Sequence, residues 1–266
     1  MKTRLGKQET QFLAYLQMRK KRMVRTGELT GPLHLTPDQE RELFRRMSRG
    51  GLIARVRPGL YLVPAQLPLG GSWSPDETLA INTLMEDRHG RYQICGPNAF
   101  NRYGFDNQVP NRVYAYNDRI SGERTIGVVA LTLIKVDENR LGATEEVPTT
   151  DGRIAVYSSR VRTLMDAVYD WARFNSLPQA YQWIRNELTT GRITAGELVK
   201  ITLQYGDKGT IRRIGLLLEK EGVDIKLLRK LEQVLNPSKG LIPFIPRRPK
   251  RGTAYPRWGV VYNEET

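Results

Sequence analysis

The chain has 266 residues and is strongly basic, since 42 Lys and Arg against 28 Asp and Glu give a formal net charge of +14 and a pI of about 10.0. Hydrophobic residues make up 39%, which is enough for a folded core and excludes a disordered basic tail. The length suits a small domain followed by a larger one. Such a charge favours a polyanionic partner or an acidic protein surface.

The sequence predicts a cytoplasmic protein. Cys95 is the single cysteine, which excludes an internal disulfide, and we expect it to be a small core residue. The first residues, MKTRLGKQETQ, contain no apolar run, so no signal peptide is expected. No stretch approaches 18 consecutive apolar residues, so no membrane span is expected either.

Two helices are expected before residue 36. The first runs from Glu9 to Arg22, with apolar side chains on one side. The second is short and begins at Thr26-Gly27-Glu28-Leu29. In a helix-turn-helix this second helix crosses the DNA backbone, which makes Thr26 a candidate phosphate contact. The connection from Gly31 to Leu35 is longer than in the simplest form of the motif.

The stretch from Thr36 to Pro64 is the most informative, and it opens with a helix. Thr36, Pro37 and Gln39 form a capping-box pattern at its start. Leu43, Phe44 and Met47 share one side, which predicts that this side is buried. Gly50-Gly51 ends the helix. The opposite side carries a row of arginines: Arg41, Arg45 and Arg49, with Arg46 on its flank.

A hairpin follows the double glycine. Ile53 to Val56 and Leu60 to Val63 are strand-like, and Arg57-Pro58-Gly59 is a turn sequence. A helix followed by a basic hairpin is typical of the second half of a winged helix-turn-helix. The predicted DNA-binding residues are therefore Thr26, Gln39, Arg41, Arg45, Arg46, Arg49, Arg55 and Arg57. The alternative is a solvated charged face, which Asp38, Glu40 and Glu42 favour, since Glu42 could pair with Arg46.

Gln66 to Ser74 is rich in proline and glycine and is the best linker candidate. We therefore predict an α+β protein in two domains, a winged helix-turn-helix over residues 1–68 and a larger mixed α/β domain over 72–266 with a helical C-terminal half. Ser74-Pro75-Asp76-Glu77 resembles a second capping box, opening a helix to about Arg88. The expected strands of one mixed or antiparallel sheet are Val113 to Tyr116, Thr125 to Val136 and Arg153 to Tyr157.

After Ser158 the pattern is mostly helical. Thr194-Ala195-Gly196-Glu197 is a third capping box, opening a helix to about Tyr205. Gly209 to Gly222 is amphipathic, and Ile225 to Leu235 follows as the last helix. Leu241 to Asn263 is expected to form a closing hairpin with a basic loop.

Enzyme signatures are missing, because the sequence has no Walker loop, no G-x-S-x-G elbow and no H-E-x-x-H. His34 and His89, with one cysteine, cannot make an ordinary zinc cage. We therefore predict no catalytic residues, no metal and no cofactor. Asp224 in Asp-Ile-Lys could belong to a nuclease-like motif, although a charged helix start is the favoured interpretation. Arg162 and Asp166, four apart on one helix, indicate an intrahelical pair.

The C-terminal third is also basic. Its candidate surface for a toxin, an acidic partner or further DNA consists of Arg212, Arg213, Arg247, Arg248, Lys250 and Arg251, and plain surface charge is the alternative. Trp258 is predicted to be a core anchor.

Three segments together resemble the AbiEi family, the antitoxins of type IV toxin–antitoxin systems related to abortive phage infection. The first is GGLIARVRPGLYLV. The second is VYSSRVRTLMDAVYD, similar to an arginine-threonine-leucine-x-aspartate helix common in that family. The third is GTIRRIGLLLEKEG followed by RWGVVYN. The resemblance covers most of the chain, and the order and spacing of the segments are its specific part.

The resemblance implies a transcriptional autorepressor. Family members bind inverted repeats in their own promoter through the N-terminal winged helix, and two copies of the chain would be needed on a palindromic operator. Their C-terminal domain contributes to repression and counters a nucleotidyltransferase-like toxin without a stable complex. By position, the six arginines of the helix and hairpin would contact DNA, whereas the roles of Arg162, Asp166, Arg212 and Arg213 stay unassigned.

Two other functions remain open. One is a DNA-binding regulator without a toxin, whose larger domain serves dimerisation or ligand sensing. The other is a nuclease with an unrecognised carboxylate site that includes Asp224.

Overall fold

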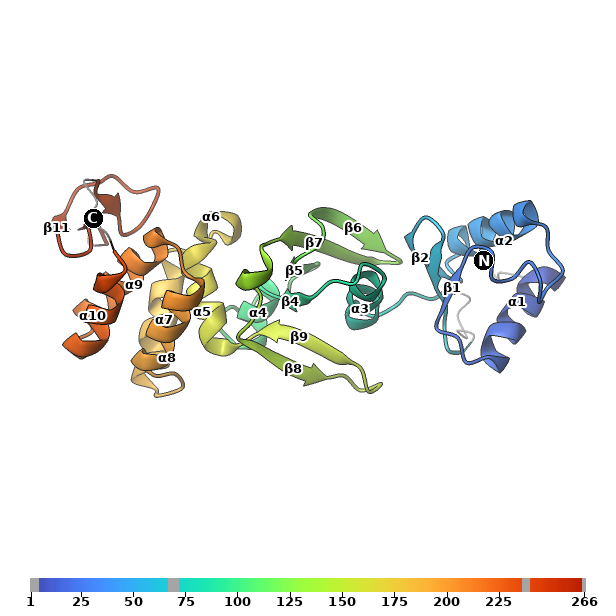
Figure 1. Ribbon diagram of the computed structural model, residues 1–266, viewed down its shortest axis with the longest axis horizontal. Coiled ribbons are helices and arrows are strands. Elements are labelled where there is room, and N and C mark those ends of the chain that lie inside the picture. Colours follow the sequence, from blue (N-terminus) through green and yellow to red (C-terminus); the bar gives the residue numbers. More distant parts are fainter. Residues whose placement is uncertain (1–4, 67–71, 236–239, 265–266) are drawn as a thin grey trace. The chain divides into compact units, whose positions relative to one another are not determined.

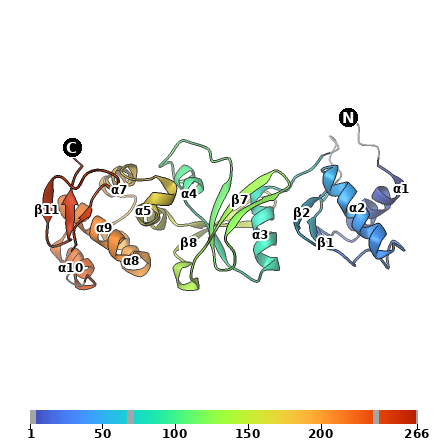
Figure 2. The ribbon, with the colours of Figure 1, turned by 90° about the horizontal axis from the view of Figure 1, so that it is seen from above.

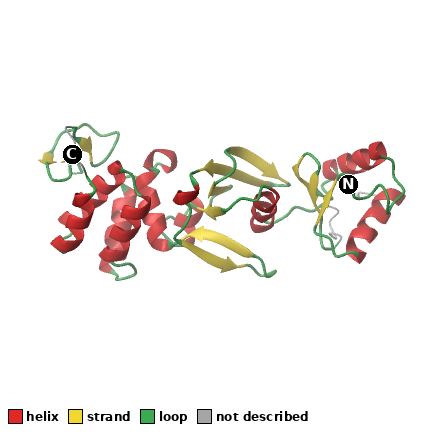
Figure 3. Ribbon diagram, in the orientation of Figure 1, coloured by secondary structure: helices red, strands yellow, loops and turns green. Residues whose placement is uncertain are grey.

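The computed structural model describes residues 5–66, 72–235 and 240–264. It is a mixed α+β protein with a helical C-terminal half, as predicted (Figures 1 and 3). The chain forms two compact units, which divide it differently from the predicted domains 1–68 and 72–266. Unit 1 is Met1–Tyr92, Asn111–Val136 and Val147–Ala155, and unit 2 is Gln93–Pro110, Asp137–Glu146 and Val156–Thr266. Residues 67–71 of the predicted linker lie outside the described residues.

The N-terminal segment of unit 1 combines two helices with a small antiparallel sheet (Figure 1). The sheet has the order β1-β3-β2, and Val24 pairs with Tyr61 in it. Phe44 packs edge-on against Phe12 at 5.8 Å between ring centroids, so the predicted apolar helix side is buried. The elements are α1 (Lys7–Met18), β1 (Met23–Arg25), α2 (Pro37–Arg49), β2 (Ala54–Arg57) and β3 (Leu60–Leu62).

The capping box of α2 is confirmed, since the Thr36 side chain accepts from the Gln39 amide and the Gln39 side chain accepts from the Thr36 amide. The expected short helix at Thr26 is wrong, because the chain forms turns between β1 and α2. Gly27 has φ +97°, which a right-handed helix does not allow. The carboxylate of Glu40, fully buried, accepts from the amides of Gly27 at 2.6 Å and Leu29 at 2.8 Å.

The rest of unit 1 holds α3 (Glu77–Asp87), which contacts β7 (Val129–Lys135; Figure 2). The capping box expected at Ser74 is wrong, because Asp76 is the N-cap of α3 and its side chain accepts from the Leu79 amide. The predicted strand from Thr125 to Val136 is two strands, β6 (Gly122–Ile126) and β7, paired antiparallel. Gly127, at φ +64°, turns the chain between them. β5 (Val113–Asn117) pairs in parallel with β7, so the sheet is mixed.

Three further strands extend this sheet, whose order is β6-β7-β5-β4-β9-β8. They are β4 (Tyr92–Ile94), β8 (Thr144–Pro148), which the sequence did not predict, and β9 (Ile154–Ser158). Ile94 of β4 and Tyr157 of β9 pair in parallel within unit 2. Between the strands lie α4 (Pro97–Arg102) and a 3-10 turn, η1 (Glu138–Arg140).

The helices of unit 2 pack around one apolar core that includes Trp258, which is 1% exposed and so confirms the predicted anchor. The capping box of Thr194 and Glu197 is confirmed. The helices are α5 (Arg160–Tyr169), α6 (Trp171–Phe174), α7 (Gln179–Thr189), α8 (Ala195–Tyr205), α9 (Lys208–Lys220) and α10 (Ile225–Gln233).

A three-stranded sheet covers the end of the chain. Its antiparallel pair, β11 (Thr253–Tyr255) with β12 (Val260–Tyr262), is a shorter hairpin than the one expected over Leu241 to Asn263, and the basic residues expected in its loop precede it in the chain. β10 (Ile242–Pro243) adds in parallel to β12. In the described parts of the chain, every helix is too short or too polar to cross a bilayer.

Candidate nucleic-acid interface

The exposed face of α2 carries the predicted row of arginines, and most of them are paired with carboxylates. Arg41 pairs with Asp38, and Arg45 donates twice to Glu42 at 2.7 Å. Glu42 therefore pairs with Arg45, whereas the sequence suggested a pair with Arg46. The hydrogen bond from Arg45 lowers the pKa of Glu42 below its usual value.

Arg46 reaches from α2 to the first helix. Its guanidinium lies 3.0 Å from Glu9 of α1 and also donates to Gln8 at 3.3 Å. These contacts link α2 to α1, so Arg46 has a structural role in addition to carrying a positive charge.

Arg57, a predicted DNA contact at the hairpin turn, does not project freely into solvent, because it is paired with Asp87. Its Nε donates to Oδ2 of Asp87 at 2.5 Å and its Nη2 to Oδ1 at 2.8 Å, a bidentate pair. Arg25 of β1 donates to the same Oδ1 at 2.8 Å. The Asp87 side chain is 5% exposed, and the hydrogen bond from Arg57, followed by that from Arg25, holds its pKa well below the usual range.

Thr26 and Gln39 have structural partners. The Thr26 amide donates to the Gly59 carbonyl at 3.0 Å, which ties the start of the turns to the hairpin tip, and its side chain stays exposed. The Gln39 side chain completes the capping box, so its amide oxygen is already used.

Arg49 and Arg55 are the two predicted contacts whose guanidinium groups remain available. Both are exposed, and within the described ranges neither makes an ion pair. Arg49 ends α2 and Arg55 lies in the middle of β2, so they stand on either side of the Gly50-Gly51 turn.

Sequence reasoning missed Arg25, Glu40 and Asp87 as determinants of this region. The sequence indicated Arg25 only through its place in Met23–Arg25, which is exposed-buried-exposed in β1. Asp87 gave no signal, because its partners lie 30 and 62 residues away along the chain.

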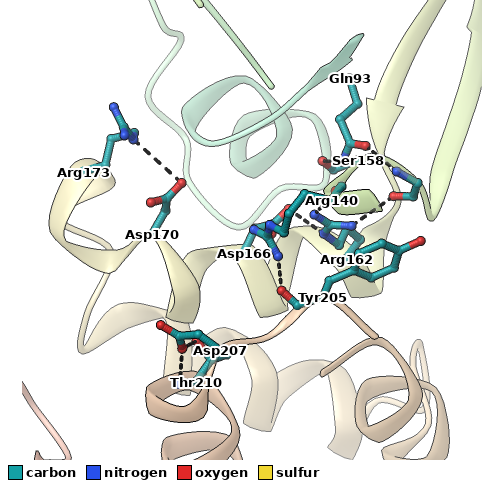
Figure 4. Close-up of polar contacts among 11 residues, drawn as sticks. Gln93, Arg140, Ser158, Arg162, Asp166, Asp170, Arg173, Tyr205, Asp207 and Thr210 are labelled. Atoms are coloured by element: carbon teal, nitrogen blue, oxygen red, sulfur yellow. Dashed lines mark hydrogen bonds and ion pairs between the residues drawn. The ribbon is translucent and has the colours of Figure 1, made fainter. Parts of the chain in front are cut away.

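The arginine-threonine-leucine-x-aspartate segment forms a buried polar cluster in unit 2 (Figure 4). Arg162, fully buried, donates from Nε to Asp166 at 2.9 Å, which confirms the predicted intrahelical pair. Its other nitrogens donate to the carbonyls of Gly142 at 3.1 Å and Arg140 at 2.9 Å. The guanidinium also lies 3.9 Å from the ring centroid of Tyr205.

Arg140 completes this cluster from η1. It donates to Asp166 at 3.2 Å and to the Tyr205 carbonyl, and it stacks 3.8 Å from the ring centroid of Tyr169. Burial raises the pKa of Asp166, and the charges of Arg162 and Arg140 oppose that rise. The geometry fixes the 140–142 loop onto α5, which is a structural role.

Arg212 and Arg213 are not surface residues, and the predicted basic surface is wrong for both. Each is 8% exposed. Arg212 donates to the Trp258 carbonyl at 2.7 Å and to the carbonyls of Gly240 and Gly259, whereas Arg213 donates to the Pro243 carbonyl at 3.3 Å. Burial lowers the pKa of both guanidinium groups. These arginines hold the C-terminal sheet onto α9.

The other four residues of that predicted surface are exposed. Arg247 donates to Asn175 at 2.6 Å, Arg248 to the Glu264 carbonyl at 3.0 Å and Lys250 to the Leu241 carbonyl at 3.0 Å. Arg251 is exposed as well.

Asp224 caps α10, because its side chain accepts from the Lys226 amide at 2.7 Å. This geometry favours the helix-start interpretation over the nuclease-like motif. The described residues contain no group of three or more His, Cys, Asp or Glu side chains that could hold a metal ion.

No family model matches the chain, and no curated protein does either. Among solved structures, the chain is similar to the crystal structure of the RV2827C protein from Mycobacterium tuberculosis. The TM-score is 0.59 at 13% sequence identity, over 97% of this chain and 92% of that one. At this identity the likeness shows a shared fold alone.

Proposed function

We propose that the N-terminal segment is a winged helix-turn-helix that binds double-stranded DNA, with α2 as the recognition helix and the β2–β3 hairpin as the wing. The observation that carries the proposal is the arginine face of α2, which ends at Gly50 and leads through one turn into a basic hairpin. In such modules the helix enters the major groove and the hairpin meets the phosphate backbone.

The paired arginines are compatible with this role. Arg41 and Arg45 are 65% and 55% exposed, and their carboxylate partners Asp38 and Glu42 are 87% and 40% exposed. Exposed ion pairs contribute little free energy, so a phosphate can compete for these guanidinium groups. Arg49 and Arg55 need no such exchange.

We further propose that this DNA binding represses the operon that encodes the chain, and that the protein acts as an antitoxin against a nucleotidyltransferase-like toxin without a stable complex. This proposal is supported by the resemblance of the three quoted segments to the AbiEi family. It assigns the protein no catalytic residues and places it in the cytoplasm.

The test of DNA binding is a mobility-shift assay with the chain's own upstream region, against competitor DNA at moderate salt. Arg45→Ala and Arg49→Ala are each expected to weaken binding by about tenfold, because each removes a charge-assisted contact. Arg173→Ala, which removes an exposed arginine of unit 2, is the matched control and should bind as the wild type does. Equal retardation of the specific and competitor DNA would contradict the repressor proposal.

The second candidate is a DNA-binding regulator without a toxin, which a pocket lined by Arg49 and Arg55 at the end of α2 favours. Co-expression with the neighbouring gene product separates the two functions. Rescue of cells that express a nucleotidyltransferase-like toxin supports the antitoxin, whereas normal repression without rescue supports the regulator.

A further inference from the structure

A pocket of about 430 Å³ lies in unit 1 at the point where α2 ends. One wall comes from the last turn of α2 and from β2, and it carries Arg49 and Arg55. The other wall comes from residues 72–74 and the β6–β7 hairpin, and it carries Trp73 and Thr125. Concave sites of about 300–1,000 Å³ are typical of small-molecule binding.

The pocket is positively charged. Its described lining contains two arginines and no aspartate or glutamate. Arg49 and Arg55 make no ion pair with any residue that the structure describes, whereas Arg41, Arg45, Arg46 and Arg57 all do. Two guanidinium groups that face one concave space are the usual means of binding a phosphate, because each offers a planar fork of donors.

The remaining lining supplies hydroxyl groups and one indole. Ser48, Ser72 and Thr125 add hydroxyls that can donate to phosphate oxygens, and Trp73 adds an aromatic surface. The Trp73 amide donates to the Gly51 carbonyl at 2.6 Å, which joins the two walls. Ser74 Oγ accepts from the Val128 amide at 3.0 Å, so the β6–β7 turn is also fixed in place.

We propose that this pocket binds a small phosphate-bearing molecule, with its phosphate between Arg49 and Arg55 and its organic part against Trp73. This site goes beyond the proposed function, because the ligand is bound in the absence of DNA. A nucleotide has the required chemistry, since it combines a phosphate with a flat ring.

The test measures binding of inorganic phosphate, pyrophosphate, AMP and ATP to the full chain without DNA, by calorimetry and by tryptophan fluorescence. We expect saturable binding of at least one nucleotide. Arg49→Ala and Arg55→Ala should each weaken it by about tenfold, the effect of losing one charge-assisted contact. Arg22→Ala, which removes an exposed arginine of unit 1 outside the pocket, should leave the affinity unchanged.

Trp73→Phe assigns the fluorescence change to the pocket. It should abolish that change while calorimetry still detects binding, which also shows that the variant is folded. Arg49→Lys and Arg55→Lys keep the charge and should lose less affinity than the alanine variants.

Three results would overturn the proposal. These are the absence of saturable binding at millimolar ligand, binding that survives both alanine substitutions, and, in a separate titration with duplex DNA, a Trp73 fluorescence change that the nucleotides do not produce. The last result would make the pocket a DNA contact. Because the nucleotide titrations contain no DNA, their failure leaves the mobility-shift result intact, and the reverse also holds.

Discussion

At the scale of single residues, Asp87 is a nearly buried carboxylate of unit 1 that is held by two arginines. It accepts from Arg57 and Arg25 while its own side chain is 5% exposed. A carboxylate with so little exposure to solvent needs its hydrogen-bond donors to stay ionised, because an unpaired buried charge costs free energy. The arginines are 35% and 45% exposed and can return to water when the pair breaks.

Asp87→Asn tests this dependence. Loss of the charge is expected to lower the free energy of unfolding by about 1–2 kcal/mol, a discounted value because both arginines are partly solvated. Urea unfolding followed by circular dichroism measures it. Asp38→Asn, whose side chain is 87% exposed, is the control and should change stability by less than about 0.5 kcal/mol. Equal effects of the two variants would contradict this account.

The lowered pKa of Asp87 predicts that the free energy of unfolding depends on pH. The hydrogen bonds from Arg57 and Arg25 lower the pKa of Asp87 in the folded state, so the folded form releases its proton more readily than the unfolded form. The stabilisation is complete above the ordinary carboxyl pKa of about 4 and is lost as the pH falls below it. Unfolding curves at neutral pH and at about pH 3 should therefore differ more for the wild type than for Asp87→Asn.

At the scale of elements, α9 and the C-terminal sheet meet at Gly215. A Cβ built on Gly215 would overlap the ring of Trp258, which is buried. A helix interior normally prefers alanine to glycine, so only the close approach of the indole explains this glycine.

Gly215→Ala is therefore expected to destabilise the protein, by about 1–3 kcal/mol, through overpacking. Gly196→Ala in α8 is the matched control, since its nearest described neighbour would be 3.9 Å from the new Cβ. There the substitution should be neutral or stabilising by up to about 1 kcal/mol. Thermal unfolding compares the two variants, and a neutral Gly215→Ala would show that the helix can shift away from Trp258.

Local signals predicted the elements that depend on them. Thr36 and Gln39 marked the start of α2, and Pro58-Gly59 marked the hairpin turn, because caps and turns use residues close in sequence. The turns after Thr26 were mistaken for a helix, because the carboxylate that holds their amides belongs to Glu40.

The candidate site was predictable only in part. The arginines of α2 and β2 were identified from their spacing, but the opposite wall of their pocket comes from residues 72–74 and from the β6–β7 hairpin. Arg212 and Arg213 looked like surface charge beside an apolar stripe. Their acceptors are backbone carbonyls 28 to 47 residues later in the chain, and a sequence pattern does not indicate which carbonyls accept hydrogen bonds.

At the scale of the whole molecule, the net charge of +14 does not show which arginines of unit 1 are free of an internal ion pair. Four of the six arginines proposed to contact DNA already have carboxylate partners within the chain: Arg41, Arg45, Arg46 and Arg57. The fold shared with the mycobacterial protein extends over 97% of the chain, well beyond this basic segment.

Those internal pairs have a thermodynamic consequence for DNA binding. Affinity falls with salt in proportion to the phosphates that a protein neutralises, because each releases condensed counterions, with a slope of about −0.9 per phosphate. If all six arginines contacted phosphates, the slope would be about −5 for each bound copy of the chain. If only the unpaired Arg49 and Arg55 acted, the slope would be about −2. We expect a value between these two, because the exposed Arg41 and Arg45 can exchange their carboxylates for phosphates, and anisotropy over a series of salt concentrations measures it. A steep slope would mean that DNA draws the paired guanidinium groups away from their carboxylates.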